Sequence, residues 1–266
     1  MSHVQSHSGK LSVVTGASTG IGFELAKHCV QDGMDVLLVA DEPQIADAAS
    51  QLQAFGSGRL TPLEADLSTV EGVDRLLAAV GDRPIEHLIA NAGRGMGHAF
   101  VDQDWGDVLH VLNTNVTGTL YLLHRLLPRM VAAGHGRVLI TGSIAGYMPG
   151  SYSAVYNGTK AFLDSFAFAI RDELKDTGVS VTCLMPGATD THFFERADML
   201  DTKVATEKKM DPADVARQGY DAMLAGEGNV ITGWQNKMQV AMASVLPGEH
   251  SARKYAEEAA PGTAKS

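Results

Sequence analysis

Short apolar runs and amphipathic helical patterns alternate along almost the whole chain. The apolar runs occupy residues 11–15, 35–40, 59–64, 86–91, 137–141, 179–185 and 229–233. The helical patterns occupy residues 21–31, 44–54, 70–80, 105–132, 155–176 and 212–224. Continuously apolar strands are typical of parallel sheets covered on both faces, and strand–helix–strand repeats impose right-handed crossovers. We therefore predict a single-domain α/β fold of the Rossmann type, with a doubly wound seven-stranded parallel sheet and helices on both faces.

Three segments fall outside this rhythm and bound the predicted domain, which spans residues 10–246. Residues 1–9 form an N-terminal extension. Residues 188–210 follow the sixth strand and are longer than an ordinary connection, which predicts a lid over the substrate. Residues 247–266 are dominated by small and charged side chains, so we predict a flexible C-terminal tail.

The composition restricts the partners and the location of the protein. Asp and Glu outnumber Lys and Arg by 31 to 21, and the net charge is −10. An acidic surface repels nucleic acid and anionic membranes, so we expect neither as a partner. No apolar run has the length of a membrane span, and the first residues lack a signal-peptide pattern. Cys29, Cys183 and the ten histidines show no metal-ligand spacing, so we expect a cytoplasmic protein without a metal site.

A glycine-rich turn joins the first predicted strand to the first predicted helix. It reads Thr15-Gly16-Ala17-Ser18-Thr19-Gly20-Ile21-Gly22. Glycines at such a turn let the backbone approach a pyrophosphate, and the helix N-terminus offers its free N–H groups. Three residues separate Gly16 from Gly20, unlike the common Gly-x-Gly-x-x-Gly spacing, and a glycine turn alone fits any strand-to-helix connection. Its position after the first strand favours dinucleotide binding.

Further polar positions follow the third and fourth predicted strands. Asp66 and Leu67 follow the third strand, and Asn91-Ala92-Gly93 follow the fourth. Ligands of open α/β sheets bind at the carboxyl ends of the strands. These residues therefore predict additional contacts with the same ligand, although Asp66 taken alone is equally suited to cap a helix.

Tyr156 and Lys160 lie four residues apart at the start of a predicted helix, so they share one helical face. Ser143 follows the fifth predicted strand. A phenol with a pKa of about 10 is a poor acid–base catalyst at neutral pH, and a neighbouring ammonium lowers that pKa. A serine hydroxyl could hold a carbonyl oxygen beside this proton donor. The structural alternatives are a surface tyrosine–lysine pair and a serine that caps a turn.

In combination these motifs resemble the short-chain dehydrogenase/reductase family over about residues 10–234. The residues that carry the resemblance are Thr15, Gly16, Gly20, Gly22, Asp66, Leu67, Asn91, Ala92, Gly93, Asn115, Ser143, Tyr156, Lys160, Pro186 and Gly187. The resemblance implies a nicotinamide-dependent oxidoreductase that interconverts a ketone or aldehyde and an alcohol by hydride transfer. It also implies a homodimer or a homotetramer.

The resemblance further implies a role for each catalytic residue. Tyr156 would be the general acid–base, and Ser143 would hold the reacting oxygen. Lys160 would bind the nicotinamide ribose and lower the pKa of Tyr156. Asn115, in the middle of the predicted helix 105–132, would hold a water that links Lys160 to solvent. The implied cofactor contacts are Gly16, Ser18, Thr19, Gly20, Ile21, Gly22, Asp41, Asp66, Leu67, Asn91, Ala92, Gly93, Tyr156, Lys160, Pro186, Gly187, Thr189 and Thr191.

Substrate pockets in this family are built after the catalytic serine, after the Asn-Ala-Gly motif and in the segment after the sixth strand. Here those positions hold Ile144, Tyr147, Met148, Pro149, Arg94, Met96, His98, Met185, His192, Phe193 and Phe194. Among them we expect substrate contacts from Ile144, Tyr147, Met148, Met96, Phe193 and Phe194, together with Ser143. The largely apolar set favours an apolar or aromatic substrate over a sugar. Packing beneath a loop is an equal alternative, and Arg94 or His192 could instead recognise a carboxylate.

Asp41, at the end of the second predicted strand, bears on the choice of cofactor. Relatives that use NADP generally carry an arginine at this position or a basic residue at the position of Thr19, and this chain has neither. Relatives that use NAD carry an acidic residue one position earlier, at what is Ala40. Because a carboxylate repels the 2′-phosphate of NADP, we predict a preference for NAD. The alternative role for Asp41 is to cap the next helix.

Two other functions would use parts of the same pattern. A non-catalytic dinucleotide-binding sensor or scaffold would need the glycine turn but not Ser143, Tyr156 and Lys160. A nucleotide-sugar epimerase shares the Tyr-x-x-x-Lys chemistry, but such relatives have closer glycine spacing and a larger C-terminal domain. The complete catalytic set therefore favours the oxidoreductase.

Overall fold

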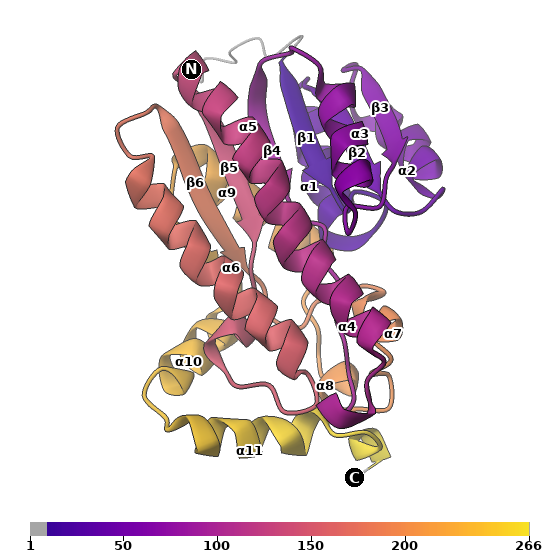
Figure 1. Cartoon of the computed structure of the whole chain (residues 1–266), viewed down its shortest axis with the longest axis vertical. Coiled ribbons are helices and arrows are strands. Elements are labelled where there is room, and N and C mark those ends of the chain that lie inside the picture. The colour runs from indigo at the N-terminus through magenta and orange to yellow at the C-terminus, as the bar shows by residue number, and fades with distance from the viewer. Residues whose placement is uncertain (1–9, 266) are drawn as a thin grey trace.

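The computed structural model of the protein describes residues 10–265, and the predicted N-terminal extension 1–9 lies outside the described residues. Seven parallel strands form one sheet in the order β3-β2-β1-β4-β5-β6-β7 (Figure 1). The strands are β1 (Leu11–Thr15), β2 (Asp35–Ala40), β3 (Leu60–Glu64), β4 (Ile85–Ala90), β5 (Gly136–Thr141), β6 (Val179–Met185) and β7 (Asn229–Ile231). Each observed strand boundary lies within two residues of the predicted one, so the predicted doubly wound α/β fold is confirmed.

Helices cover both faces of this sheet. On one face lie α1 (Gly20–Gln31), α2 (Ile45–Leu52) and α9 (Pro212–Ala225), which share a buried apolar cluster with β1, β2 and β6. On the other lie α3 (Val70–Val80), α4 (Trp105–Leu112), α5 (Thr119–Ala133) and α6 (Ala154–Glu173). The sheet is therefore shielded from water on both sides, as its continuously apolar strands require.

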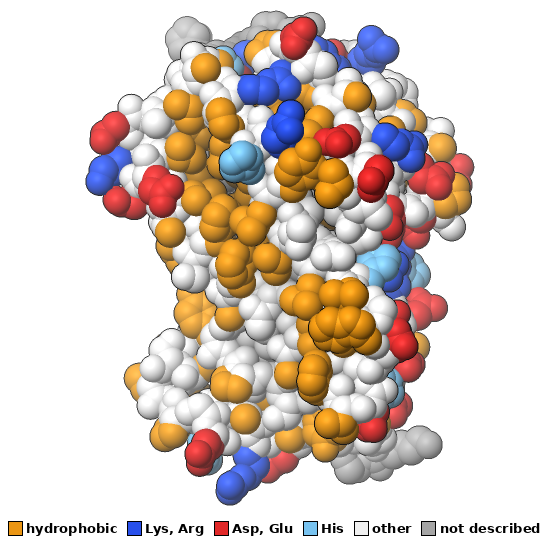
Figure 2. All heavy atoms as spheres, viewed as in Figure 1, with side chains coloured by type: hydrophobic (Ala, Val, Ile, Leu, Met, Phe, Trp, Pro, Cys, Tyr) orange, Lys and Arg blue, Asp and Glu red, His pale blue; other side chains and the backbone are white. Residues whose placement is uncertain are grey.

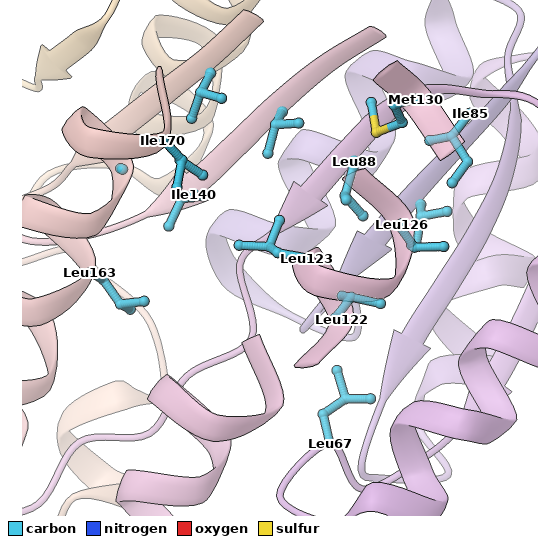
Figure 3. Close-up of a cluster of buried hydrophobic side chains, with 14 of the residues drawn as sticks. Leu67, Ile85, Leu88, Leu122, Leu123, Leu126, Met130, Ile140, Leu163 and Ile170 are labelled. Carbon is cyan, nitrogen blue, oxygen red and sulfur yellow. The ribbon is translucent and has the colours of Figure 1, made fainter. Parts of the chain in front are cut away.

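The cluster beneath α5 and α6 is the larger of the two (Figure 3). Leucines at 122, 123 and 126 lie on one stripe of α5 and are at most 1% exposed, because their spacing matches the helical period. They meet Leu88 of β4 and Ile140 of β5, while Leu163 and Ile170 come from α6. This packing fixes α6 against the sheet. It therefore also fixes the positions of the side chains on α6 that lie near the carboxyl end of β5.

The predicted helix over residues 105–132 is interrupted. The chain is helical over this whole range, but between α4 and α5 the backbone widens into a π-helical segment, Asn113–Gly118. The widened turn brings the fully buried Asn115 side chain inward, where its amide makes three hydrogen bonds. Gly118 packs so tightly against the Leu67 carbonyl that a Cβ would overlap with it. Such π turns inside helices occur mostly where a side chain must be aimed at a functional site.

The C-terminal region is ordered rather than a flexible tail. Beyond β7 the chain forms α10 (Trp234–Ala243) and α11 (Gly248–Ala259), neither of which was predicted. Ala259 of α11 is 1% exposed because it packs in a small cluster with Phe194 and Met199. The backbone N–H groups of Gly262 and Ala264 donate to Asp201 at 2.8 and 2.9 Å. These long-range contacts, which leave no local pattern, explain why the predicted tail is wrong.

The predicted lid contains two short helices, α7 (Phe193–Arg196) and α8 (Lys203–Thr206). In Figure 1 these helices lie with α10 and α11 beyond the carboxyl ends of the strands. No helix within residues 10–265 is both long and apolar enough to cross a membrane.

Candidate active site

A cavity of about 670 Å³ lies at the carboxyl ends of the strands. Its wall is formed by the turns after β1 to β6, by the lid and by residues of α10 and α11. Every cofactor contact predicted from the sequence lines this cavity, as do Ser143, Ile144, Met148, Phe193 and Phe194. The topology thus brings together residues that lie as far apart in the sequence as Gly16 and Thr191.

The turn between β1 and α1 has the shape that a pyrophosphate needs. Gly16 and Gly20 have φ values of +65° and +59°, which side chains rarely adopt. A Cβ on Gly22 would overlap with the carbonyl oxygen of Gly16, so only glycine lets the helix begin this close to the strand. Thr19 precedes α1 without a side-chain cap, and the first turn has no acidic residue. The free N–H groups and positive end of α1 therefore fit the phosphates of a dinucleotide.

Asn91 links three neighbouring strands at this edge of the sheet. Its amide donates to the Thr15 carbonyl at 3.1 Å and accepts from the Thr141 hydroxyl at 3.0 Å. Thr15 Oγ1 in turn accepts from the backbone N–H groups of Asn91 and Ala92, each at 3.0 Å. The Asn-Ala-Gly motif thus fixes the end of β1, where the glycine turn begins, relative to the end of β5, in addition to lining the cavity.

Asp66 closes the turn before α3 but does not cap that helix. Its carboxylate accepts the Ser68 N–H at 2.9 Å, whereas the N-cap is Thr69, whose hydroxyl accepts from Gly72 at 3.0 Å. Partial burial would raise the pKa of Asp66, but the hydrogen bonds from Ser68 outweigh it and the pKa is lowered. An ionised carboxylate therefore lies on the cavity wall at the place expected for the adenine end of the ligand.

Two ion pairs lie where the adenosine ribose is expected. Arg94 Nη2 is 3.4 Å from Asp41 Oδ2, and the Arg196 guanidinium donates to both carboxylate oxygens of Glu42, at 2.9 and 3.0 Å. The Ser18 hydroxyl also donates to Glu42. Glu42 and Arg196 were not predicted as site residues, because nothing local in the sequence indicates that they meet. Each of the two carboxylates at the end of β2 therefore has an arginine partner.

The predicted catalytic residues converge on one wall of the cavity. Ser143 is 6% exposed, and its hydroxyl donates to the Pro186 carbonyl at 3.3 Å and accepts the Ala145 N–H at 3.1 Å. The Ser143 hydroxyl also acts to lower the pKa of the Tyr156 phenol, so the two groups lie near each other on this wall. Because Tyr156 stands on the first turn of α6, packing of that helix on the sheet aims its phenol at Ser143. A substrate oxygen at this point would meet two hydroxyl donors together.

Lys160, one turn further along α6, is 4% exposed and donates to the Thr141 carbonyl at 2.7 Å. Its Nζ lies 5.9 Å from the Tyr156 ring centroid. Burial lowers the pKa of Lys160 to about 8. The expected lowering of the Tyr156 pKa is not observed in the structure. Burial of the phenol raises its pKa, and the nearby Ser143 hydroxyl opposes that rise only in part.

The Asn115 side chain makes hydrogen bonds to two segments of the protein near Lys160. Its Oδ1 accepts the Arg94 N–H at 2.7 Å, and its Nδ2 donates to the Arg94 carbonyl at 2.9 Å and to Thr159 Oγ1 at 3.0 Å. Both amide hydrogens are therefore used to join the segment after β4 to α6. The Asn115 side chain therefore positions these two segments against each other.

The substrate end of the cavity agrees with the sequence only in part. The Phe193 ring lies against that of Tyr156, with 5.0 Å between the ring centroids and a tilt of 55° between the ring planes. Tyr147 and Met96 do not line the cavity within the described residues, in contrast to the other predicted substrate contacts. The Tyr147 hydroxyl points to Met185 Sδ at 3.6 Å, and its ring packs on the main core because the turn after Ser143 directs it inward. Neither Pro149, His98 nor Met185 is part of the described wall.

Several wall residues at this end were not predicted. They are Ser153, Met199, Val204, Glu207, Lys208, Gln239, Tyr255 and Glu258. Half of them lie in α8, α10 and α11, which the sequence did not predict. Arg94 and His192, which could have recognised a substrate carboxylate, each have an acidic partner within the protein. Arg94 pairs with Asp41, and His192 lies 2.9 Å from Glu195. No local pattern predicted these residues, because part of the substrate end is built by helices near the C-terminus that are distant in sequence from the other wall residues.

Residues 10–199 match the protein-family model described as short chain dehydrogenase. Serine 3-dehydrogenase of Agrobacterium fabrum is 31% identical over 223 residues, which cover 81% of this chain and 83% of that protein. A short-chain dehydrogenase from Sphingobium yanoikuyae in complex with NADPH is 26% identical, with a TM-score of 0.79 over 90% of this chain and 96% of that one. A family member from Burkholderia phymatum in complex with NAD is 22% identical, with a TM-score of 0.79 over 89% and 93%.

The chain therefore belongs to the short-chain dehydrogenase/reductase family. It is an oxidoreductase that acts on CH–OH groups with NAD or NADP, and relatives are known with each of these cofactors.

Proposed function

We propose that this protein interconverts an apolar or aromatic ketone or aldehyde and the corresponding alcohol, with Tyr156 as the general acid–base. The observation that carries this proposal is that Tyr156, Ser143 and the buried Lys160 all line the same cavity, with Lys160 one helical turn from Tyr156. Ser143 holds the substrate oxygen, and Lys160 binds the nicotinamide ribose hydroxyls. A dinucleotide-binding sensor or scaffold would have no need of this arrangement.

The bound nicotinamide supplies or accepts the hydride. In carbonyl reduction the Tyr156 phenol gives its proton to the oxygen that Ser143 holds, and in alcohol oxidation it receives that proton. Because burial raises the pKa of Tyr156, the phenol keeps its proton at neutral pH and is ready to act as an acid. The side chains as they stand therefore favour carbonyl reduction.

NAD is the cofactor we propose, with a modest preference over NADP. The glycine turn and the start of α1 hold the pyrophosphate, and Asp41 and Glu42 face the adenosine ribose. An isolated carboxylate there would disfavour a 2′-phosphate by roughly 1–3 kcal/mol. Each carboxylate has an arginine partner, so we expect the preference to lie at the lower end of that range.

The substrate wall supports an apolar ligand. It is lined by the apolar side chains of Phe193, Phe194, Met148 and Met199. Arg94 and His192, which could have bound a substrate carboxylate, are paired with Asp41 and Glu195. Aromatic rings and flexible methionines accommodate apolar groups of varied shape. The Agrobacterium relative is named for a small polar amino acid, and we propose that this protein accepts a larger and less polar substrate.

A panel of aromatic and aliphatic ketones tests this function, with NADH and NADPH each supplied in turn. We expect oxidation of the reduced cofactor with at least one aryl ketone and slower turnover of serine-like substrates. Cofactor binding without turnover of any carbonyl or alcohol would instead support the sensor. The Tyr156→Phe variant serves as the control for contaminating reductases.

We also propose that the protein forms a homodimer or homotetramer through the face of α4 and α6. Hydrophobic side chains gather on this side of the molecule (Figure 2). Trp105 and Leu109 of α4 are 62% and 38% exposed, and Phe162 and Phe168 of α6 are each 41% exposed. Exposed apolar groups of this size favour association. Sedimentation of the wild-type protein and of Phe168→Glu tests the proposal, since the charged variant should dissociate.

A further inference from the structure

Asp164 is a buried acidic residue that the mechanism above does not use. It lies four residues after Lys160 and eight after Tyr156, so all three side chains share one face of α6. The residue is 6% exposed, although aspartate is among the residue types least often buried. A carboxylate in such a place costs free energy unless its surroundings use the charge.

The surroundings form a socket shaped for this carboxylate. Its Oδ1 accepts the backbone N–H of Ser143 at 3.2 Å and the Cys183 thiol at 3.5 Å. A Cβ on Gly142 would overlap with Oδ1, and a Cβ on Gly146 would overlap with Oδ2. Two glycines, one on each side of the catalytic serine, therefore leave room for the two oxygens. The fit holds the Ser143 turn from beneath.

The second carboxylate oxygen indicates that more than a hydrogen bond is involved. Oδ2 is buried and has no hydrogen-bond partner among residues 10–265. A side chain required only to hold the Ser143 N–H would be less costly as an asparagine or a serine, since neither carries charge. A charge retained in this low-dielectric region acts strongly on any titratable group near it.

Four titratable groups face Asp164. Tyr156 and Lys160 come from α6, Tyr147 comes from the turn after β5, and Cys183 comes from β6. The phenols and the thiol are neutral when protonated, and burial raises the pKa of each of them. Lys160 is thus the one group of the four that can offer Asp164 a positive charge.

We propose that Asp164 is a positioning residue that holds the Ser143 backbone and supplies the buried negative charge that keeps Lys160 protonated. The Lys160 ammonium has one hydrogen bond, to the Thr141 carbonyl, and almost no contact with water. Without a counter-charge, burial would drive it towards the neutral amine. Because Lys160 must be a cation to bind the ribose hydroxyls well, Asp164 acts on cofactor binding through Lys160.

The pKa directions agree with this geometry. Burial lowers the pKa of Lys160 to about 8, and Asp164 is the first of the groups that oppose this fall. Burial raises the pKa of Asp164 to about 6, while the Ser143 N–H and Lys160 act in the other direction. Between these two values both groups are charged. Removal of the Asp164 charge should therefore lower the Lys160 pKa further, and the alkaline loss of cofactor affinity should begin at a lower pH.

The Asp164→Asn variant separates the two roles. The amide oxygen of asparagine can still accept the Ser143 N–H, but the charge is gone. Asp172→Asn is the matched control, since Asp172 is on the same helix with a 78% exposed side chain. The Lys160 side chain is titrated by NMR in protein with ¹³Cε-labelled lysine, and its signal is assigned by its absence in Lys160→Met. The dissociation constant of NADH is measured over the same pH range by fluorescence.

We expect Asp164→Asn to lower the Lys160 midpoint by about one pH unit or more. The pH at which NADH binding weakens should fall in parallel, and Asp172→Asn should change neither. An unchanged Lys160 midpoint in Asp164→Asn would reduce Asp164 to a structural hydrogen-bond acceptor and overturn the proposal. If Asp164→Asn does not fold, Lys160→Met tests the same coupling, because loss of the cation should raise the Asp164 pKa seen by ¹³Cγ NMR, and no rise would be equally decisive.

The proposal rests on the proposed function only in the role given to Lys160 at the cofactor. The NMR titration requires neither cofactor nor substrate. Wild-type protein that fails to bind NADH would therefore contradict the proposed function while leaving the Asp164–Lys160 coupling testable.

Discussion

Arg196 of the lid contacts both carboxylate oxygens of Glu42 at the end of β2, at 2.9 and 3.0 Å. Glu42 also accepts a hydrogen bond from Ser18 in the glycine turn. A short chain of contacts thus joins the lid to the segment that cradles the pyrophosphate. The contact places one end of the lid where the adenosine half of the cofactor is expected.

Arg196→Ala should loosen the lid without greatly destabilising the fold. Since Arg196 is 46% exposed, we expect a loss of at most about 1 kcal/mol in unfolding free energy. Hydrogen exchange within residues 188–210 should become faster, and the KM for the cofactor should rise a few-fold. Arg217→Ala is the matched control, because Arg217 makes an exposed 2.9 Å ion pair with Asp214 on α9. Equal exchange rates in both variants would show that the Arg196–Glu42 contact does not restrain the lid.

The pH dependence of this contact follows from Glu42. Partial burial acts to raise the pKa of Glu42, but the hydrogen bond from Ser18 and the charge of Arg196 outweigh it and lower the pKa. A lowered folded-state pKa means that the stabilisation is present above the unfolded value and is lost as pH falls through the folded one. Lid exchange should therefore stay slow down to pH values below 4.5, the ordinary pKa of a glutamate.

Tyr156→Phe should lower kcat by about 10²- to 10⁴-fold, because it removes the proton donor and keeps the ring. NADH affinity, measured by fluorescence titration, should stay within a factor of about three of the wild type, since Lys160 and the glycine turn remain. Tyr147→Phe is the control, as the Tyr147 hydroxyl contacts Met185 and lies off the described cavity wall. Retention of most of the wild-type kcat by Tyr156→Phe would contradict its role as the acid–base.

Asp41→Arg tests the cofactor proposal. The new guanidinium would lie beside Arg94 and offer two cations to a 2′-phosphate, so kcat/KM for NADP(H) relative to NAD(H) should rise about tenfold or more. Asp47→Arg on α2 makes the same change of net charge away from the cavity, and the ratio should not change. A wild-type kcat/KM higher with NADPH than with NADH would overturn the proposed preference.

Local periodicity accounts for what the sequence predicted correctly. The strands alternate with helices whose apolar residues, such as Leu122, Leu123 and Leu126, recur at the helical period. The fold class and the succession of elements along the chain therefore follow from short-range patterns. The glycine turn and the Tyr156–Lys160 pair are equally local. Each motif fits within one turn or one helix, and the parallel topology then places all of them at the same sheet edge.

Features that depend on long-range contacts could not be predicted in this way. Glu42 and Arg196 lie 154 positions apart. The helix α11 packs through Tyr255 and Ala259 against Phe194 of the lid, and Asp201 binds the residues that follow α11. The Tyr156 pKa likewise depends on burial, which no motif records. Asp164 is an intermediate case. Its spacing from Tyr156 and Lys160 is compatible with a shared face of α6. The space that Gly142 and Gly146 leave for its carboxylate is visible only in the structure.

Tyr255 of α11 is the residue through which the C-terminal region reaches the active site. It lines the cavity, and its hydroxyl donates to Asn157 Oδ1 at 3.5 Å. Asn157, next to the catalytic Tyr156, donates in turn to the Met148 carbonyl at 3.0 Å. The Ser151 hydroxyl donates to the Ala252 carbonyl of α11 at 2.9 Å. The helix is thus fixed to the loop before α6 and closes the substrate end of the cavity.

Tyr255→Ala should therefore widen the substrate end and change selectivity more than catalysis. We expect the ratio of kcat/KM for a bulky aryl ketone to that for a small methyl ketone to rise by about tenfold or more, because the missing ring leaves space beside Phe194. Tyr255→Phe keeps the ring and loses only the weak hydrogen bond to Asn157, so its ratio should stay close to that of the wild type. NADH affinity should be unchanged in both variants, since the glycine turn lies at the other end of the cavity. If Tyr255→Ala and Tyr255→Phe show the same ratio, the ring of Tyr255 does not limit substrate size and α11 has only a structural role.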